Sequence, residues 1–220
     1  MKASLGRRLA AEGIGTGFLL AAIIGSGIMG DRLSGGIAGI ALLANSLATG
    51  CALAVLIAVL QPISGAHLNP AVTLALAWER EIAWRDVLPY LLVQVAGAFA
   101  GVAAAHIMFG EPLFSASIKV RAGPPQWLSE ALATFGLLLV ILGCARQGIR
   151  ALPYLVAAYI TAAYWFTSST SFANPAVTLA RSASNTFAGI RPDDMPAFIV
   201  AQLAGALVAS FVLRWLAPRR

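Results

Sequence analysis

The stretch Asn69-Pro70-Ala71-Val72-Thr73-Leu74-Ala75 recurs without a single change as Asn174-Pro175-Ala176-Val177-Thr178-Leu179-Ala180, 105 residues further along the chain. Chance is a poor explanation for seven identical residues in a chain of 220. The repeat therefore predicts an internal duplication, in which the chain consists of two related halves.

A second echo in the sequence supports the duplication. The stretch Gln94-Val95-Ala96-Gly97-Ala98 resembles Gln202-Leu203-Ala204-Gly205-Ala206. We divide the chain into halves at roughly 1–110 and 115–220, which together form a single domain of residues 1–220.

The composition is that of a protein whose main solvent is lipid. Hydrophobic residues make up 59% of the chain and charged residues only 11%, and the mean hydropathy is +0.82. Soluble chains carry about 25% charged residues, so this chain has too few charges to cover a water-facing surface. These values exclude a soluble globular domain, a disordered chain, a collagen and a disulfide framework.

The net charge of +6 does not indicate a nucleic-acid partner. The fifteen Lys and Arg residues are scattered singly between apolar runs, whereas nucleic-acid-binding proteins gather them on one face. The two cysteines, Cys51 and Cys144, both lie inside apolar stretches and are interpreted as small buried hydrophobes.

Six apolar runs are long enough to cross a bilayer, which takes about 20 residues each. They are residues 9–29, 37–60, 87–108, 127–145, 151–168 and 196–216. Six crossings place both termini on one side of the membrane. Outside these runs, the termini and even-numbered loops hold ten Lys and Arg residues and the odd-numbered loops hold five. The positive-inside rule therefore predicts that both termini are cytoplasmic.

Each half contains three of these crossings, so the second half must enter the membrane inverted relative to the first. The fold class predicted is an all-α membrane protein with two inverted repeats. The repeated stretch then lies in a cytoplasmic loop in one half and in an extracellular loop in the other.

The repeated stretch predicts two re-entrant half-helices. Residues Ala71 to Trp78, and likewise Ala176 to Ala183, form an apolar run of about two turns, near 12 Å, which can enter the membrane only half-way. Asn is a favoured N-cap and Pro is favoured at the first helical position, so each Asn-Pro pair marks a helix start. Such backbone is stable inside a membrane only where it is buried in protein or lines a watery cavity.

Two half-helices whose N-termini meet at the membrane midplane would place about +0.5 elementary charge each at that point, which repels cations. The side-chain amides of Asn69 and Asn174 would offer N–H donors to the oxygen of a passing solute. This arrangement favours a neutral hydroxylic solute over a proton or a metal ion. The alternative is that each Asn-Pro merely caps an ordinary loop helix.

Two glutamates within the apolar runs form a third pair of related residues. Glu12 lies in the first run and Glu130 in the fourth, where a carboxylate is costly and is usually functional or paired. We expect them to accept hydrogen bonds from free N–H groups of the re-entrant loops, with a proton relay as the alternative. Gln94 and Gln202 are expected to form hydrogen bonds between helices.

The residues Ser64-Gly65-Ala66-His67-Leu68-Asn69-Pro70-Ala71-Val72-Thr73, together with Asn174-Pro175-Ala176, resemble the major intrinsic protein family of aquaporins and aquaglyceroporins. The resemblance covers nearly the whole chain. It implies six tilted transmembrane helices plus two half-helices around a pore in each protomer of a homotetramer in the lipid bilayer. It also implies passive flow of small neutral solutes and water, with no cofactor, no bound metal and no enzymatic chemistry. His67 is grouped with Glu12 and Glu130 as a residue that supports the loops.

One departure from the family pattern concerns the constriction. The family usually has an arginine directly after the second Asn-Pro-Ala, but here that residue is Val177, and an arginine follows one turn later as Arg181. Because residues four apart share a helix face, we expect a relocated constriction, with Arg181 about 6 Å nearer the extracellular mouth. The alternative is that Arg181 is an exposed loop charge.

Counting from the two motifs, the other family constriction positions fall at Thr49, Ala162 and Ser171, all of which are small. A one-turn misalignment at Ala162 would bring in Tyr159 or Trp165 instead. Small residues predict a wide opening that passes glycerol-like polyols and neutral metalloid hydroxides such as arsenous acid. The run from Asn174 to Ser182 also resembles a bacterial subgroup linked to arsenic handling, which implies a bacterial inner membrane.

Two other functions remain open from the sequence. A water-selective aquaporin would need a narrower constriction than the one predicted. An ion- or proton-coupled secondary transporter also uses inverted repeats, and Glu12 and Glu130 would then be its titrating groups.

Overall fold

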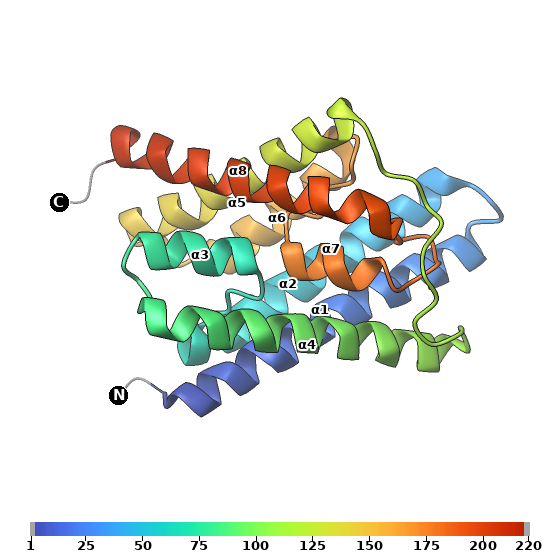
Figure 1. The fold of residues 1–220 in the computed structure, drawn as a ribbon, viewed down its shortest axis with the longest axis horizontal. Coiled ribbons are helices and arrows are strands. Elements are labelled where there is room, and N and C mark those ends of the chain that lie inside the picture. Colours follow the sequence, from blue (N-terminus) through green and yellow to red (C-terminus); the bar gives the residue numbers. More distant parts are fainter. Residues whose placement is uncertain (1–2, 218–220) are drawn as a thin grey trace.

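The computed structural model describes residues 3–217, and the prediction of an all-α protein is confirmed there. These residues form eight α-helices and one short 3-10 helix, η1: α1 Leu5–Leu33, α2 Ala38–Ser64, α3 Pro70–Trp78, α4 Trp84–Phe109, α5 Pro124–Gln147, α6 Leu152–Phe166, α7 Pro175–Arg181, η1 Pro192–Asp194 and α8 Met195–Leu216 (Figure 1). Lys2, Arg219 and Arg220, which entered the charge count, lie outside the described residues.

Five of the helices are long and apolar enough to cross a membrane: α1, α2, α4, α5 and α8. The remaining span of the sequence interpretation corresponds to α6, which has 15 residues. At 1.5 Å per residue α6 is roughly 22 Å long, shorter than the roughly 30 Å hydrocarbon core. Five of the six expected crossings are therefore helices long enough to span a membrane, and the remaining run forms a shorter apolar helix.

The two short helices α3 and α7 lie in the middle of the molecule, almost end to end (Figure 1). Each begins at the proline of the repeated motif, as the Asn-Pro start signal predicts. α3 ends at Trp78 as expected, but α7 ends at Arg181, two residues before the predicted Ala183. The backbone leaves the α-helix there because Ser182 and Ala183 donate to Leu179 and Ala180, which closes tighter turns.

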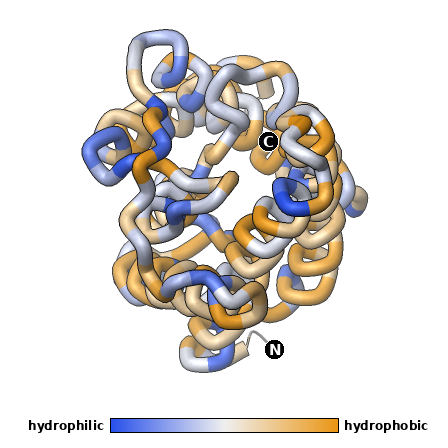
Figure 2. The backbone as a smooth tube through the Cα atoms, turned by 90° about the vertical axis from the view of Figure 1, so that its right-hand side faces the viewer, coloured by the Kyte–Doolittle hydropathy of each residue, from blue (hydrophilic) through white to orange (hydrophobic). Residues whose placement is uncertain are grey.

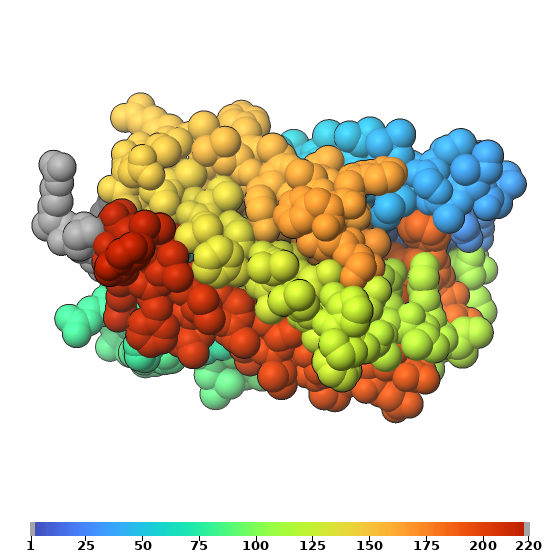
Figure 3. Space-filling view, turned by 90° about the horizontal axis from the view of Figure 1, so that it is seen from above, coloured from blue at the N-terminus to red at the C-terminus, as the bar shows by residue number. Residues whose placement is uncertain are grey.

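The long helices pack in two equivalent pairs. α1 lies against α4 in the first half, and α5 lies against α8 in the second, where Figure 3 shows α8 (red) running beside α5 (yellow to yellow-green). α2 and α6 contact each other and join the halves. α1 begins and α8 ends at the same end of the bundle (Figure 1). We call this the proximal end and the opposite one the distal end.

Glycines allow the paired helices to approach each other at backbone distance. A Cβ atom built on Gly97 of α4 would lie 2.2 Å from the carbonyl oxygen of Gly13 in α1. In the second half, a Cβ on Gly205 of α8 would lie 2.1 Å from the carbonyl oxygen of Ala131 in α5. The second echo in the sequence thus corresponds to the same close helix crossing in both halves.

The outer surface is apolar, as a lipid-facing surface requires. Large hydrophobic side chains such as Phe18, Val55 and Val200 are more than half exposed in the middle of long helices. Figure 2, which looks along the bundle, shows mostly hydrophobic residues (orange) in the surrounding helices. Together with the apolar helices, this surface makes the protein an integral, multi-pass membrane protein.

The close approach of α1 and α4 at Gly13 and Gly97 predicts that one added methyl group lowers the stability of the protein. Gly97→Ala should lower the free energy of unfolding by roughly 1–3 kcal/mol, because the new Cβ would push α4 away from the α1 backbone. Gly143→Ala is the matched control, because a Cβ there meets nothing within 4 Å. Thermal unfolding of both variants in the same detergent checks this expectation, and equal melting temperatures would contradict it.

Candidate functional site: a cavity at the meeting point of two half-helices

The N-terminal ends of α3 and α7 face each other, and each is capped by the asparagine of its motif. The Asn69 side-chain oxygen accepts from the backbone N–H of Ala71 at 2.9 Å. The Asn174 oxygen accepts from Ala176 at 3.0 Å and from Val177 at 3.3 Å. Both asparagines therefore satisfy N–H groups that a helix start would otherwise leave without a partner.

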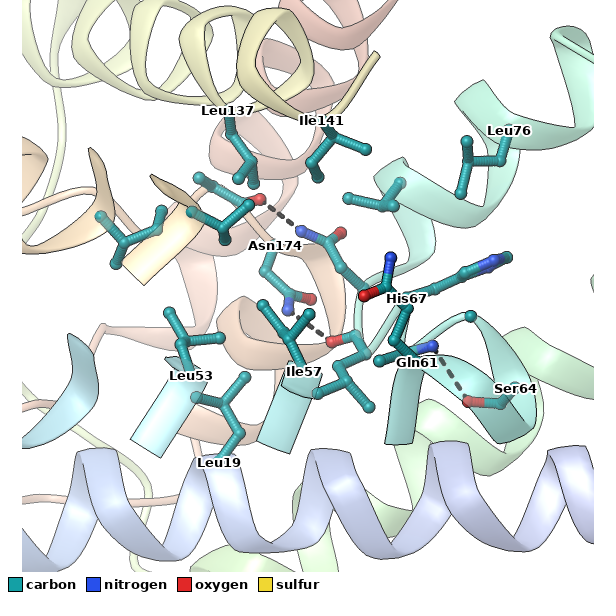
Figure 4. A pocket seen from close by; sticks show the side chains of 18 of the residues that line it. Leu19, Leu53, Ile57, Gln61, Ser64, His67, Leu76, Leu137, Ile141 and Asn174 are labelled. Atoms are coloured by element: carbon teal, nitrogen blue, oxygen red, sulfur yellow. Dashed lines mark hydrogen bonds between the residues drawn. The ribbon is translucent and has the colours of Figure 1, made fainter. Parts of the chain in front are cut away.

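The same asparagines lock the two loops together across the centre of the molecule. Asn69 Nδ2 donates to the carbonyl oxygen of Ala173 at 2.7 Å, and Asn174 Nδ2 donates to the carbonyl oxygen of Leu68 at 2.8 Å (Figure 4). Each amide nitrogen carries two hydrogens, so one N–H of each remains for another acceptor. Both amides lie where the half-helices meet and line the same cavity.

The loops that lead into the half-helices share an unusual backbone. Ala66 and Leu68 have φ values of 48° and 50°, and their counterparts Ser171 and Ala173 have φ values of 51° and 47°. A left-handed conformation is unfavourable for residues with a side chain, so both loops need external support. The same strained backbone geometry therefore occurs in both halves of the chain.

Glu12 supplies that support in the first half. Its carboxylate accepts from the backbone N–H groups of His67 at 2.9 Å and Leu68 at 2.7 Å, and from the Ser64 hydroxyl at 2.7 Å. Gln94 of α4 donates to the same carboxylate at 2.9 Å. Glu12 is fully buried, and these donors stabilise a charge that would otherwise be costly there.

Glu130 makes the equivalent contacts in the second half. It accepts from the backbone N–H groups of Phe172 and Ala173, both at 2.9 Å, and from Gln202 of α8 at 2.6 Å. The glutamine also donates to Thr178 of the half-helix, as Gln94 donates to Thr73 in the first half. Each half-helix is thus tied to two long helices through one glutamate and one glutamine.

His67 fixes the start of the first half-helix from the side. Its Nδ1 lies 3.1 Å from the hydroxyl of Thr73, and that hydroxyl donates to the carbonyl oxygen of Asn69. Because the hydroxyl hydrogen is already used, we assign the imidazole hydrogen to Nδ1. The ring also packs against Tyr90, with the ring centroids 5.1 Å apart.

A cavity of about 380 Å³ runs past the meeting point of the two half-helices. The helices α1, α2, α5 and α6 line it with residues spaced about four apart, which is one face of each helix. These residues are Leu19 and Ile23 of α1, Thr49, Leu53, Ile57 and Gln61 of α2, Leu137, Ile141 and Ala145 of α5, and Leu152, Val156, Ile160 and Tyr164 of α6. The half-helices add Asn69, Val72 and Leu76 of α3 and Asn174, Val177 and Arg181 of α7.

The cavity wall is therefore two-sided. Figure 4 shows Leu19, Leu53, Ile57, Leu137 and Ile141 around the Asn174 amide. Most of the aliphatic side chains come from α1, α2, α5 and α6, and the Asn69 and Asn174 amides lie at the N-terminal ends of the half-helices. A solute in the cavity would meet a largely apolar surface with a few fixed hydrogen-bond donors.

At its distal end the cavity reaches Thr49, Tyr164, Ser171 and Arg181, and Val177 lines it one turn before Arg181. The prediction for Ala162 is wrong, because the structure places this residue on the exposed side of α6. Tyr164 faces the cavity instead, and its hydroxyl lies 3.2 Å from that of Thr49. Ala162 is two residues from Tyr164, and two residues turn a helix by about 200°.

The two other residues considered at this position also lie elsewhere. Tyr159 donates to the carbonyl oxygens of Leu132 and Ala133 in α5, and Trp165 is half exposed. The distal end therefore contains the aromatic ring of Tyr164 in place of the small alanine that the sequence interpretation expected.

Arg181 faces the cavity, and the interpretation as an exposed loop charge is wrong. Its side chain is 1% exposed, and it lies on the same face of α7 as Asn174 and Val177. Its guanidinium stacks on the Phe172 ring, 3.3 Å from the centroid, and Nε donates to the carbonyl oxygen of Ala188. The counterpart of Arg181 in the first half is Leu76, which lines the proximal part of the cavity (Figure 4).

An ion cluster around the buried Glu79 anchors the other end of the first half-helix. Glu79, directly after α3, pairs with Arg146 of α5 at 2.9 Å and with Arg214 of α8 at 2.8 Å. Arg214 also donates to the carbonyl oxygen of Trp78. These contacts hold α3 against the second half of the chain, and none of the three charged residues was singled out from the sequence.

Comparisons with known proteins agree with this geometry. The family model described as "Major intrinsic protein" matches residues 1–152. The chain is 56% identical to Aquaglyceroporin AqpS of Rhizobium meliloti (strain 1021), over 96% of this chain and 91% of the relative. It is 33% identical to Aquaporin AqpM of Methanothermobacter thermautotrophicus, over 97% and 98% of the two chains.

The fold also matches that of a solved structure. The X-ray structure of the aquaglyceroporin from Plasmodium falciparum superposes with a TM-score of 0.77, and the match covers 96% of each chain. The sequences are 22% identical, so this likeness concerns the fold.

The hydrogen bonds of Glu130 predict a large effect from a small change. In Glu130→Gln, one carboxylate oxygen becomes an NH₂ group that faces the N–H donors of Phe172, Ala173 or Gln202. We expect a loss of about 1.5–3 kcal/mol in the free energy of unfolding, the usual range for a hydrogen bond to a charged group. Glu111→Gln, in an exposed pair with Arg32, is the control. Denaturation of both variants in detergent checks the expectation, and equal stability would show that Glu130 does not support the loop.

Proposed function

The chain belongs to the major intrinsic protein family, and from this premise we propose that it is a passive channel for glycerol-sized neutral solutes and water. The proposal rests chiefly on one observation, the two-sided cavity at the meeting point of the half-helices. Polyols have hydroxyl groups along a short hydrocarbon chain. The aliphatic residues can contact the carbon atoms, while the Asn69 and Asn174 amides donate to the hydroxyl oxygens.

The distal end offers further polar contacts to such a solute. The Ser171 hydroxyl is buried and has no hydrogen-bond partner in the described chain. The Nε of Arg181 donates to the carbonyl oxygen of Ala188, and the guanidinium lies at the same end of the cavity as Ser171. We assign Thr49, Tyr164, Ser171, Val177 and Arg181 to the constriction, with Tyr164 in place of Ala162.

The presence of Val177 supports the proposal that the solute is larger than water. A valine stands where the family resemblance implies an arginine, and the arginine lies one turn further out. The space beside Val177 is then free for a solute with the size of glycerol. Neutral metalloid hydroxides such as arsenous acid have a similar size and also carry only hydroxyl groups, so we include them among the proposed solutes.

The environment of the buried glutamates favours a passive channel over a coupled transporter. Glu12 and Glu130 each accept two backbone N–H groups and one glutamine amide, so their oxygens are occupied by the loops and helices that they hold. A coupling site needs a carboxylate that exchanges a proton or an ion during transport. These carboxylates are instead part of the scaffold, and the cavity is proposed to act without enzymatic chemistry.

We further propose the setting in which the channel works. The chain forms a single channel domain and assembles as a homotetramer in a bacterial inner membrane. The proximal end, where α1 begins and α8 ends, faces the cytoplasm, in agreement with the excess of Lys and Arg in the corresponding loops. The distal end with Arg181 then faces the outside of the cell.

Solute flux into liposomes tests this proposal. Stopped-flow light scattering on reconstituted protein should show entry of glycerol and arsenous acid, and osmotic water flow, well above protein-free liposomes. Val177→Phe should reduce solute entry at least tenfold, because the larger side chain fills the cavity. Val55→Phe is the matched control, since Val55 is 62% exposed on the outer face of α2.

Three results would contradict the proposal. Solute entry at the level of protein-free liposomes would exclude a solute channel, and fast water flow with excluded solutes would favour the water-selective alternative. Uptake that depends on a pH gradient or on membrane potential would favour the coupled transporter.

A further inference from the structure

Arg121 is a buried cation beside the constriction. It belongs to residues 110–123, which connect α4 to α5 and cross the distal end of the bundle near the end of α7 (Figure 1, yellow-green). The side chain of such a connecting segment is usually exposed, but Arg121 is only 8% exposed. The sequence interpretation treated it only as one of the scattered charges.

Four hydrogen bonds hold Arg121 between separate segments of the distal end. Its backbone N–H donates to the Asp194 carboxylate at 2.8 Å. Nε donates to the carbonyl oxygen of Gly189 at 2.9 Å, and Nη1 donates to the carbonyl oxygen of Ser169 at 2.9 Å and to the Thr170 hydroxyl at 3.4 Å. Arg121 thus binds both the loop that enters α7 and the loop that leaves it.

Arg121 and Arg181 contact the same aromatic ring. The guanidinium carbon of Arg121 lies 4.9 Å from the centroid of the Phe172 ring, and that of Arg181 lies 3.3 Å from it. The two arginines also bind consecutive carbonyl groups, Gly189 for Arg121 and Ala188 for Arg181. They therefore form one unit with Phe172 at the distal end of the cavity.

The charged groups around this unit do not cancel its positive charge. The two carboxylates nearby, Glu130 and Asp194, already accept several hydrogen bonds, and Asp194 also pairs with Arg191. Lys119 adds a further cation, with its ammonium group 2.6 Å from the carbonyl oxygen of Phe187. Burial lowers the pKa of the Arg121 guanidinium to about 10, so it keeps its charge at neutral pH. In a site with little water, such fixed charges act strongly on an ion nearby.

We propose that Arg121 is a positioning residue of the constriction that also supplies its second fixed positive charge, and that cations are excluded by Arg121 and Arg181 together. Arg121 does not line the cavity itself, so it acts through its field and through Phe172 and residues 169–171. The inference rests on the proposed channel function and deepens it. It explains how cations can be excluded although Val177 stands in place of an arginine.

Variants that separate charge from shape test this proposal. In liposomes with a pH-sensitive dye and an imposed K⁺ or H⁺ gradient, Arg121→Gln should raise the cation leak roughly tenfold, because one fixed charge is lost. Arg121→Lys keeps the charge and should restore exclusion, although it cannot reproduce the forked hydrogen bonds. Arg32→Gln, which removes an exposed distal charge paired with Glu111, should not change the leak.

Glycerol entry measured in the same vesicles separates the two hypotheses. No glycerol entry in the wild-type protein would overturn the proposed function itself. Glycerol entry with an unchanged leak in Arg121→Gln, or an equal leak in Arg121→Gln and Arg121→Lys, would overturn the role of Arg121 alone.

A second variant covers the case in which Arg121→Gln does not fold. Asp194→Asn weakens the acceptor for the backbone N–H of Arg121 and removes a nearby carboxylate charge, but it leaves the positive charge of Arg121 in place. Cation exclusion should persist in this variant while glycerol entry changes, whereas a cation leak in Asp194→Asn would show that position rather than charge excludes cations.

Discussion

The structure depends on a single constraint, which is that backbone N–H groups inside a membrane need acceptors. The loops before α3 and α7 leave the helical conformation within the bundle, so their N–H groups lack helical partners. Glu12 and Glu130 each provide a carboxylate for two of these groups. Loss of these acceptors would leave buried N–H groups without partners at the start of the two half-helices, beside the cavity.

The inverted repeat places equivalent residues on the two sides of that centre, and the differences between them give the cavity its direction. Asn69 and Asn174 are alike and form reciprocal bonds to the opposite loop. About two turns further along, Leu76 lies on the proximal side and Arg181 on the distal side. His67 and Phe172 differ in the same way, since one holds Thr73 and the other carries two guanidinium groups. We therefore propose that selection among solutes is concentrated at the distal end.

Local motifs predicted the scaffold because the physics behind them is local. An Asn-Pro helix start and a buried glutamate have the same requirements in every context, so the half-helices and their acceptors could be read from the sequence. Which residue of α6 faces the cavity depends on how this helix is rotated about its axis, and the motifs do not define that rotation. The prediction therefore missed Tyr164. The spacing of Val156, Ile160 and Tyr164, matching Thr49, Leu53 and Ile57, was the available signal. No local sequence pattern indicated the role of Arg121, because its contacts join segments that are about 50 to 70 residues apart.

The central claim is that an arginine displaced by one helical turn leaves a constriction that admits glycerol and still excludes cations. The double variant Val177→Arg and Arg181→Val moves the arginine back by one turn without changing the composition of α7. Stopped-flow measurements on the double variant should show glycerol entry reduced at least tenfold relative to wild type, with osmotic water flow and cation exclusion retained. Unchanged glycerol entry would contradict the claim, because the position of the arginine would then not determine which solutes pass.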